Sequence, residues 1–458
     1  MIMNEIRNSK HEIRIKRETM FEIFENSLIS NLFVVARVRA FLRETRNAQI
    51  LQRSLSDLIF FACSSACLRV LNGNSKYPRT RKHALLRTNP AVPELISQSD
   101  ILRTTASMKA CCVILLGCMI FFFSGNQASA AEAVFKQDPQ YQKSFDESVD
   151  KALAYLAKSQ LPDGSFPGGM AKNTAITSLC VMGYLARGYS PGLAPYGETI
   201  DRGIDFVLAS QSSDGSLVGH GGGQMYSHNI STLMLSEVSG MLNPDRQKKV
   251  DAALGKALKI ILDAQRVQKQ DTHRGGWRYE RNSNDSDLSH SGWALMALRS
   301  ARNNGAPVPK EAIDDAVGFI MKCRMQDGGF AYQPGGGASI TQTGVALLCL
   351  ELCSRHREDT TLKAGEYIAA KYDVKKTNEI PFFYYAHYYL AQGMFQLGDD
   401  QWEKFAPKIY GTLLKLQKED GSWPPIGQHE TQPGPCYATA MAVLALSVTY
   451  HQLPIYQR

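Results

Sequence analysis

The chain has 458 residues and a formal net charge of +8, from 51 Lys plus Arg and 43 Asp plus Glu. All of this excess lies in residues 1–107, which contain 17 basic and 9 acidic side chains, so the remainder is electrically neutral. A neutral remainder excludes the basic surface that nucleic-acid binding requires, and we expect no nucleic-acid partner.

Residues 108–130 have the pattern of a secretory signal peptide. Met108-Lys109 precedes an apolar run over residues 110–124, and Ala128-Ser129-Ala130 supplies the small residues of a cleavage site. We therefore predict cleavage after Ala130 and an exported protein. Such a protein is periplasmic, secreted or attached to the outer side of the cytoplasmic membrane.

This apolar run allows two alternatives. A membrane-spanning helix needs about 20 apolar residues, more than the run provides, but an uncleaved signal would still give membrane association. Leu115-Leu116-Gly117-Cys118 also resembles a lipoprotein cleavage box, although the chain stays apolar after the Cys. Because a signal acts from the N-terminus, we interpret residues 1–107 as a mis-called upstream extension or a disordered leader.

Residues 131–458 contain six copies of one unit, and four copies end in a Gln-x-x-Asp-Gly-like turn. The third copy has an insertion before Gly275-Gly276-Trp277, and the fifth keeps its helix around Tyr367-Ile368 but lacks the turn. Equivalent positions are separated by 45 to 59 residues, a length that suits two helices and a turn. These positions are Gln160, Gln211, Gln265, Arg324, Tyr372 and Gln417.

Within a unit, the stretch before the Gln position is amphipathic and predicts an outer helix, as in Val149, Leu153 and Leu156. The second stretch is apolar almost all round, as in residues 293–298 and 440–446, and predicts a buried inner helix. We therefore predict an all-α fold, an (α/α)6 toroid of six two-helix repeats over residues 131–458. Stacked helix pairs in an open solenoid are the alternative.

The repeat resembles the QW motif of squalene-hopene and oxidosqualene cyclases and the related repeat of protein prenyltransferase β subunits. The turn over Gln417–Trp423 carries the strongest resemblance, and Ser289–Leu298 is similar to an inner helix of the cyclases. The resemblance covers about residues 148–446 and implies the toroid fold. It does not select an activity, because the turn is structural.

In squalene-type cyclases the proton donor is the middle Asp of an Asp-x-Asp-Asp motif. The nearest match here is Asp285-Ser286-Asp287-Leu288, whose last position is Leu. The resemblance implies Asp285 and Asp287 as candidate catalytic residues, in an enzyme of the squalene cyclase-like isomerase or lyase type. The alternative is that both are solvated residues of a polar loop.

The prenyltransferase β subunits bind zinc through an Asp-x-Cys unit and a His. Cys436-Tyr437 is similar to part of that unit, but Gly434 stands where the Asp would be. We expect no zinc site of that kind and no cofactor. A metal or acid/base site of His228 and His290 near Asp287 is a minor alternative, opposed by helix-start histidines that bond to backbone.

Alignment of the inner helices on their Ala-Leu cores places Thr174, His228, His290, Gln342, Tyr385 and Cys436 at equivalent positions near one mouth. In this alignment Ser227-His228 matches Ser289-His290. Residues 381–389 form the densest aromatic cluster, which suits either a hydrophobic ligand or core packing. The expected cavity-lining residues are His228, His290, Gln342, Phe382, Phe383, Tyr384, Tyr385, His387 and Cys436.

Together these features favour an exported terpene cyclase or prenyltransferase-like toroid that binds or converts a hydrophobic isoprenoid-type ligand. A non-catalytic extracytoplasmic binding scaffold with the same fold is the alternative. A carbohydrate-active toroid is a third hypothesis, marked by paired acids at inner-helix starts, which the sequence does not display. The sequence indicates no oligomeric state.

Overall fold

The computed structural model describes residues 139–168, 173–219, 224–450 and 452–456. The predicted leader, residues 1–107, and the predicted signal, residues 108–130, lie outside these ranges.

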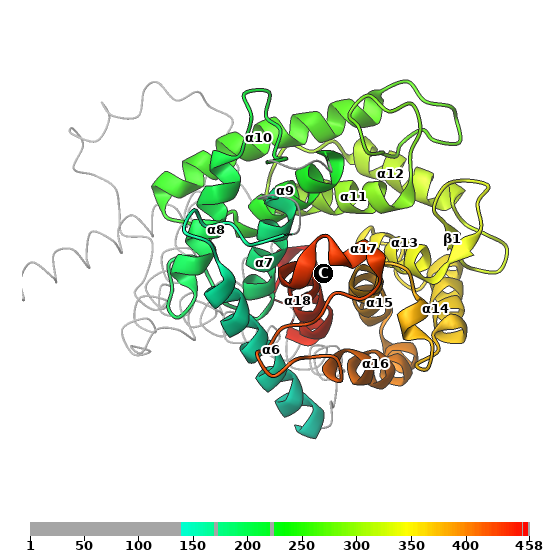
Figure 1. Cartoon of the computed structure of the whole chain (residues 1–458). Coiled ribbons are helices and arrows are strands. Elements are labelled where there is room, and N and C mark those ends of the chain that lie inside the picture. The colour runs from blue at the N-terminus through cyan, green and yellow to red at the C-terminus, as the bar shows by residue number, and fades with distance from the viewer. Residues whose placement is uncertain (1–138, 169–172, 220–223, 451, 457–458) are drawn as a thin grey trace, which may run out of the picture. The chain divides into compact units, whose positions relative to one another are not determined.

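The described chain consists of outer helices that surround inner helices (Figure 1). The outer helices are α6 (Pro139–Ser159), α8 (Gly197–Ala209), α10 (Pro244–Arg266), α12 (Lys310–Lys322), α14 (Asp359–Lys371) and α16 (Asp399–Leu414). The inner helices are α7 (Thr174–Ala186), α9 (Gln224–Val238), α11 (Leu288–Asn303), α13 (Ile340–Leu352), α15 (Phe383–Leu397) and α18 (Gly434–Leu446). Outer and inner helices alternate along the chain, as the repeat predicts.

Short elements complete the described part. Strands β1 (Phe330–Ala331) and β2 (Ala338–Ser339) pair antiparallel, with Phe330 opposite Ser339. The remaining elements are helix α17 (Gln428–Thr431) and the 3-10 turns η1 (Thr377–Glu379), η2 (Ser447–Tyr450) and η3 (Pro454–Tyr456). No helix within the described ranges combines the length and apolar character needed to cross a bilayer.

The ring of helices is closed. Each outer helix from α8 onward packs on the inner helix before it, and α6, the first, packs on α18, the last. The inner helices α7 and α18 also pack on each other. The prediction of an all-α toroid is confirmed, and the open solenoid is wrong.

The repeated Gln links each turn to the next outer helix. The Nε2 of Gln160 donates to the carbonyl oxygen of its own turn at Gly164 (3.0 Å) and to that of Thr199 in α8 (2.9 Å). Gln417 makes the same pair of bonds to Gly421 (3.0 Å) and to Ser148 in α6 (2.8 Å). The last turn is therefore fastened to the first outer helix, and this bond helps to close the ring.

The turn glycine must be glycine because the next outer helix lies directly against it. Gly275 has φ of +94°, and a Cβ there would lie 2.2 Å from the carbonyl oxygen of Asp315 in α12. Gly421 has φ of +90°, with the carbonyl oxygen of Lys151 at 2.4 Å from such a Cβ. Side chains other than hydrogen are excluded by both conformation and space.

The residue after the turn sets the register of the inner helix. It is buried, and its backbone N–H donates to a side chain in the first two turns of that helix. These pairs are Phe166 with Thr177 (3.2 Å), Leu217 with His228 (3.2 Å), Trp277 with Ser291 (2.9 Å), Phe330 with Thr343 (2.9 Å) and Trp423 with Thr439 (3.0 Å).

This register corrects the alignment of the inner helices. The structural equivalent of His228 is Ser291, and therefore the match of Ser227-His228 with Ser289-His290 is wrong by one residue. One residue along an α-helix rotates a side chain by about 100°. His228 and His290 consequently face different directions and do not form a shared site.

The C-terminal residues cover one end of the inner helices. The N–H of Ile455 donates to Glu237 Oε2 near the end of α9 (3.1 Å), and Nη1 of Arg299 in α11 donates to the carbonyl oxygen of Ile455 (3.2 Å). Gln396, near the end of α15, donates to the carbonyl oxygen of Tyr456 (3.3 Å). The C-terminal ends of these helices are thus covered by the residues that follow α18.

Candidate functional site

Asp287 begins the inner helix α11 and is completely buried. It is held there by an antiparallel bridge to Trp277, in which the Asp287 N–H donates to the Trp277 carbonyl oxygen (2.8 Å). As the helix N-cap, its Oδ1 accepts the backbone N–H of His290 (2.9 Å). The expectation of a solvated loop residue is therefore wrong for Asp287.

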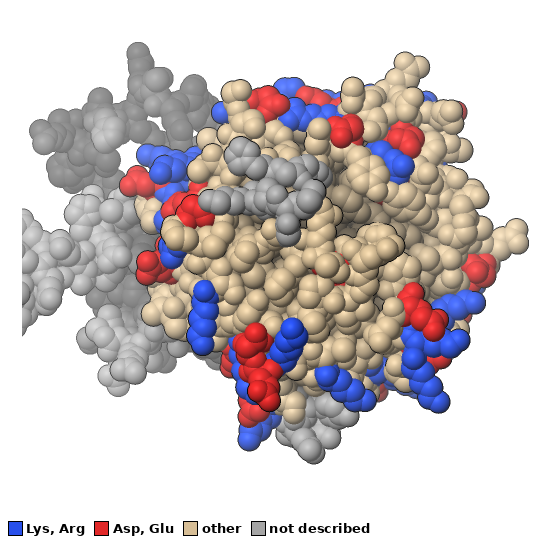
Figure 2. Space-filling model, in the orientation of Figure 1, with Lys and Arg blue, Asp and Glu red and all other residues tan. Residues whose placement is uncertain are grey.

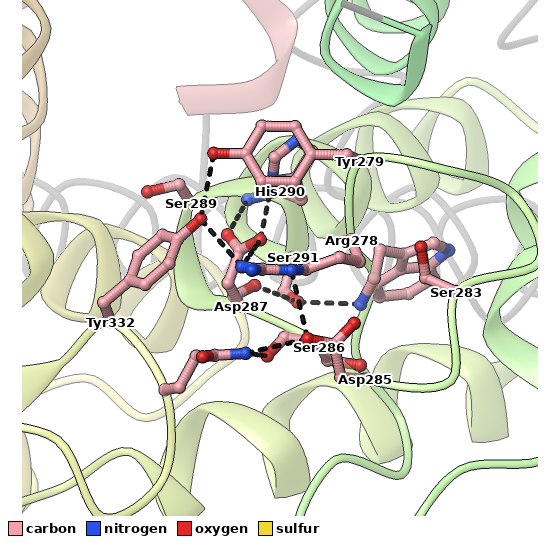
Figure 3. Close-up of polar contacts among 12 residues, drawn as sticks. Arg278, Tyr279, Ser283, Asp285, Ser286, Asp287, Ser289, His290, Ser291 and Tyr332 are labelled. Carbon is pink, nitrogen blue, oxygen red and sulfur yellow. Dashed lines mark hydrogen bonds and ion pairs between the residues drawn. The ribbon is translucent and has the colours of Figure 1, made fainter.

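Arg278 joins the two predicted acids. Its guanidinium forms ion pairs with Asp285 (3.2 Å) and Asp287 (3.0 Å) and donates from Nη1 to the Tyr332 hydroxyl (2.9 Å). Figure 3 shows Arg278 between the two carboxylates, with the Tyr279 ring above it and the Tyr332 ring to its left. Asp285 is partly exposed and also accepts from Gln333 (3.2 Å). Asp285 thus holds Arg278 at the edge of the site.

His290 is the second buried group attached to Asp287. Its Nδ1 lies 2.8 Å from Asp287 Oδ2, and both side chains are fully buried. Because a carboxylate accepts, Nδ1 of the neutral imidazole carries the proton and the lone pair is on Nε2. That Nε2 is buried without a hydrogen-bond partner among the described residues, and in Figure 3 it lies on the side of the ring away from Asp287.

The rings of two tyrosines flank the imidazole of His290. The ring centroid of Tyr226, from α9, is 3.9 Å away, and that of Tyr279 is 4.2 Å away. Tyr279 is 48 % exposed, while Tyr226 is partly buried. The imidazole of His290 is therefore packed between two aromatic rings.

These contacts decide what Asp287 and His290 can do chemically. The Asp287 carboxylate accepts from a backbone N–H, an imidazole N–H and a guanidinium. With both oxygens occupied by these donors, Asp287 presents no proton to an alkene. His290 instead offers an acceptor, because its proton is fixed on Nδ1.

More aromatic side chains gather at the centre of the inner helices. The Trp293 ring stacks on Tyr388 at 5.5 Å, and its edge contacts include Tyr389 at 5.5 Å and Tyr385 at 6.5 Å. Burial raises the pKa of Tyr385, and the nearby Asp287 raises it further, so that this hydroxyl keeps its proton and can donate.

Side chains from opposite inner helices meet at this centre. Burial raises the pKa of Tyr226, from α9, and the Tyr385 hydroxyl of α15 adds to this effect. Burial likewise raises the pKa of Tyr437, from α18, followed by the effects of Glu430 and Tyr226. Ring contacts link the inner helices directly, since Trp293 of α11 lies 6.5 Å from Tyr385 of α15 and Tyr226 of α9 lies 3.9 Å from His290 of α11.

Three of the predicted cavity-lining residues join this centre. Tyr385 belongs to the aromatic group, and Gln342 exchanges hydrogen bonds with Ser289, the neighbour of His290 (3.0 and 3.3 Å). Phe382 is 48 % exposed, and its ring lies 4.5 Å from that of His429 in α17. With His290, they form the part of the prediction that the structure brings together.

His228 is placed inside the wall instead. Its Nδ1 accepts the N–H of Leu217 (3.2 Å), and its Nε2 donates to the carbonyl oxygen of Ala257 in the outer helix α10 (3.0 Å). Burial lowers the pKa of His228 to about 4, so the ring is neutral. Both nitrogens are occupied by backbone, as expected for a structural histidine.

His387 has the same structural role in the fifth repeat. Its Nδ1 donates to the Phe383 carbonyl oxygen (2.7 Å) and its Nε2 accepts from the Tyr372 hydroxyl (2.9 Å), while burial lowers its pKa to about 4. Tyr384 donates to the Pro424 carbonyl oxygen (2.8 Å). Phe383, Tyr384, His387 and Cys436 are fully buried and belong to the wall between helices.

The sequence analysis did not nominate Arg278, Tyr226, Tyr279, Tyr332 or Glu430. Glu430, in α17, is buried and accepts the N–H of Tyr384 (2.7 Å) at the start of α15. Its pKa is raised to about 7 by burial. The signal that was available for Arg278 and Tyr279 is their position as an Arg-Tyr pair directly after Trp277, in the extended third turn.

Residues 198–377 match the family described as the prenyltransferase alpha-alpha toroid domain. This span includes Asp285, Asp287 and His290. The resemblance to cyclase and prenyltransferase toroids is confirmed. No curated protein matches the chain.

Solved structures also share the fold. Cellobiose 2-epimerase from Spirochaeta thermophila is 12% identical over 69% of this chain and 98% of that chain, with a TM-score of 0.52. The type II terpene cyclase MstE from Scytonema is 14% identical over 68% of this chain and 100% of that chain, with a TM-score of 0.46. At these identities the likeness concerns the fold alone.

Proposed function

We propose that the toroid binds a hydrophobic, isoprenoid-type ligand at the N-terminal ends of its inner helices. The observation that carries this proposal is the convergence of aromatic side chains from three inner helices. Tyr226 of α9 packs on His290 of α11 with 3.9 Å between ring centroids, and Trp293 of α11 packs on Tyr385 of α15 at 6.5 Å. Aromatic rings provide large apolar contact area for a greasy chain. The match to the prenyltransferase toroid family supports the same class of ligand.

The surface around this end agrees with an uncharged ligand. In Figure 2, the central part of the face that carries α17 is formed mainly by uncharged residues, and Lys, Arg, Asp and Glu lie mostly toward its edge. Phe382 and Tyr279 are exposed there by about half of their surface, 48 % each. A hydrocarbon chain that enters at this end meets aromatic groups first.

In this proposal the protein binds the isoprenoid-type ligand and does not cyclise it by protonating an alkene. Such cyclisation needs a carboxylic acid that keeps its proton until the alkene arrives. Asp287 is instead bonded to a guanidinium and two N–H groups, and Asp285 is bonded to the same guanidinium. Neither acid has the surroundings of a proton donor.

The same ion pairs disfavour the carbohydrate-active alternative. A glycoside hydrolase needs two carboxyl groups that both face the substrate. Asp285 and Asp287 are directed toward Arg278, and the buried Glu430 is used to cap α15.

A binding assay tests the proposal. Purified protein is incubated with geranylgeraniol or squalene, and bound lipid is measured by native mass spectrometry and by quenching of Trp fluorescence. We expect one bound molecule, recovered chemically unchanged. The absence of binding by both lipids would overturn the proposal, and a cyclised product would overturn the statement about the acids.

Tyr385→Ala is the informative variant, with Tyr367→Ala as its control. Tyr385 is 8 % exposed at the ring centre, whereas Tyr367 lies on the outer helix α14. Loss of one central aromatic contact should weaken binding by about tenfold. The outer variant should bind as the unaltered protein does.

We also propose that the protein is exported through the segment 108–130 and cleaved after Ala130. Expression from Met108 in a bacterial host, followed by N-terminal sequencing of the extracytoplasmic fraction, should give a chain that starts at Ala131. Replacement of Ala128 and Ala130 by Arg should leave the precursor uncleaved. A full-length chain that stays in the cytoplasm contradicts this proposal.

A further inference from the structure

His290 presents an unused hydrogen-bond acceptor on an imidazole that packs against two aromatic rings. Its Nε2 is buried and without a partner among the described residues, and the side chain has no exposed surface. An unsatisfied buried polar atom costs about 1–3 kcal/mol, which a ligand that supplies the missing bond recovers. The free nitrogen therefore indicates where the polar group of a ligand belongs.

The tautomer of His290 defines the chemistry of that polar group. Asp287 Oδ2 accepts the Nδ1 proton at 2.8 Å, and the Asp287 carboxylate is fixed by Arg278 and by the N-cap bond. Nε2 consequently carries a lone pair and accepts only. The group of the ligand that meets it must donate a hydrogen bond.

The charges around His290 define the group further. Arg278 is the cation at this site, and its charge is already matched by Asp285 and Asp287. The three groups together carry a net charge of −1, so an anionic head group such as a diphosphate is repelled there. A hydrocarbon without a head group leaves Nε2 unsatisfied. A neutral hydroxyl satisfies both conditions and, unlike an ammonium, carries no charge that must be desolvated in this buried site.

We propose that the toroid selects a neutral isoprenoid-type alcohol, whose hydroxyl donates to His290 Nε2 between the rings of Tyr226 and Tyr279. Asp287 is the positioning residue, since it keeps the lone pair on Nε2. This inference rests on the proposed function and adds the class of head group.

Four ligands with one C20 chain test the head group. They are geranylgeraniol, its diphosphate, the amine and the hydrocarbon that lacks the oxygen. We expect the alcohol to bind at least tenfold more tightly than the other three, because one buried hydrogen bond is worth about a factor of ten. Tighter binding of the amine or the diphosphate would overturn the inference.

The outcome also separates this inference from the proposed function. Equal affinity for all four ligands would refute the head-group selection and leave isoprenoid binding intact. Failure of every ligand to bind would refute the proposed function itself.

Two variants test the role of His290. His290→Phe keeps the ring volume but removes the acceptor, so the preference for the alcohol over the hydrocarbon should vanish while the hydrocarbon still binds. Asp287→Asn permits the proton to move to Nε2, as a neutral amide no longer fixes the tautomer. The alcohol preference should then fall, and the corresponding aldehyde, which accepts, should gain affinity.

A spectroscopic readout makes the tautomer itself measurable. The 15N chemical shifts of the His290 ring in the unliganded protein should show a protonated Nδ1 and an unprotonated Nε2. The Asp287→Asn variant should shift this signal pattern toward a protonated Nε2. A protonated Nε2 in the unaltered protein would contradict the inference even if every variant failed to fold.

Discussion

Asp287 should be among the most destabilising positions to truncate. Its carboxylate accepts from the His290 backbone N–H, from His290 Nδ1 and from Arg278, and it is fully buried. Removal of one partner of a buried ion pair costs about 3–5 kcal/mol. Since Arg278 is 22% exposed and keeps Asp285 as a partner, we expect Asp287→Ala to lose about 3 kcal/mol of unfolding free energy.

Asp287→Asn separates the charge from the cap. Asn retains the side-chain oxygen that accepts the His290 N–H and is as good an N-cap as Asp. The variant loses the charge that faces Arg278, so its unfolding free energy should fall by about 1–2 kcal/mol. The ranking expected is therefore unaltered protein, then Asn, then Ala.

Urea denaturation followed by Trp fluorescence measures this ranking, with the slope against urea required to stay constant. Asp263→Ala is the control, because this carboxylate is 53% exposed and pairs with Lys259 on the surface of α10. Such surface pairs contribute less than about 1 kcal/mol. A loss below about 1 kcal/mol for Asp287→Ala would refute the view that this carboxylate organises the site.

Other parts of the ring give further predictions. Gln417→Ala should cost about 1 kcal/mol more than Gln211→Ala, because Gln417 also accepts from a Ser hydroxyl (2.6 Å), and equal losses in urea denaturation would contradict this. Gly275→Ala should lower the unfolding free energy by about 2 kcal/mol or more through strain at positive φ. Gly255→Ala, in open space on α10, should raise the unfolding free energy by about 0.5–1 kcal/mol. A higher melting temperature for Gly275→Ala than for Gly255→Ala would be inconsistent with the turn geometry. Burial raises the pKa of Glu237 to about 7, above the unfolded value of about 4.3, so the unfolding free energy should fall by roughly 3 kcal/mol as pH rises from about 4 to 7. Glu237→Gln should flatten that part of the curve of unfolding free energy against pH. An unchanged curve in this variant would contradict the prediction.

The toroid could be predicted from sequence because its closing contacts repeat. Gln160, Gln211, Gln265 and Gln417 each bond to their own turn and to the next outer helix. A contact that is made several times in the same way requires the same residue type at regular intervals in the sequence. The fourth repeat replaces this bond by an ion pair of Arg324 with Asp359 (3.4 Å), and the position is still recognisable by its spacing.

The register of the inner helices could not be obtained in the same way. Their apolar cores are nearly uniform, so an alignment on Ala and Leu can slip by one residue without any change in hydrophobicity. What fixes the register is a hydrogen bond to the preceding turn, made by Thr177, His228, Ser291, Thr343 or Thr439. Because Thr, His or Ser can accept this hydrogen bond, no single residue type marks its position in the sequence.

The surroundings of Asp287 were missed for a related reason. Its local sequence is a polar loop, and local polarity predicts exposure. The burial of Asp287 comes from the bridge to Trp277, ten residues earlier, and from the Leu288 N–H that donates to the Tyr332 carbonyl oxygen (2.9 Å). Such contacts between distant segments are invisible to a pattern that extends over four residues.

The two ends of the ring explain why the function should reside in the third repeat. At one end the C-terminal residues satisfy the polar groups of the inner helices, as Ile455 does for Glu237 and Arg299. At the other end Thr177, Thr343 and Thr439 satisfy the preceding turns with minimal side chains. The third repeat meets that need with Ser291 and adds a buried Asp287–His290 pair that the ring does not require for closure. A buried Asp–His pair that stabilises no repeat contact, and that leaves one nitrogen without a partner among the described residues, is best accounted for by the ligand that nitrogen would bind.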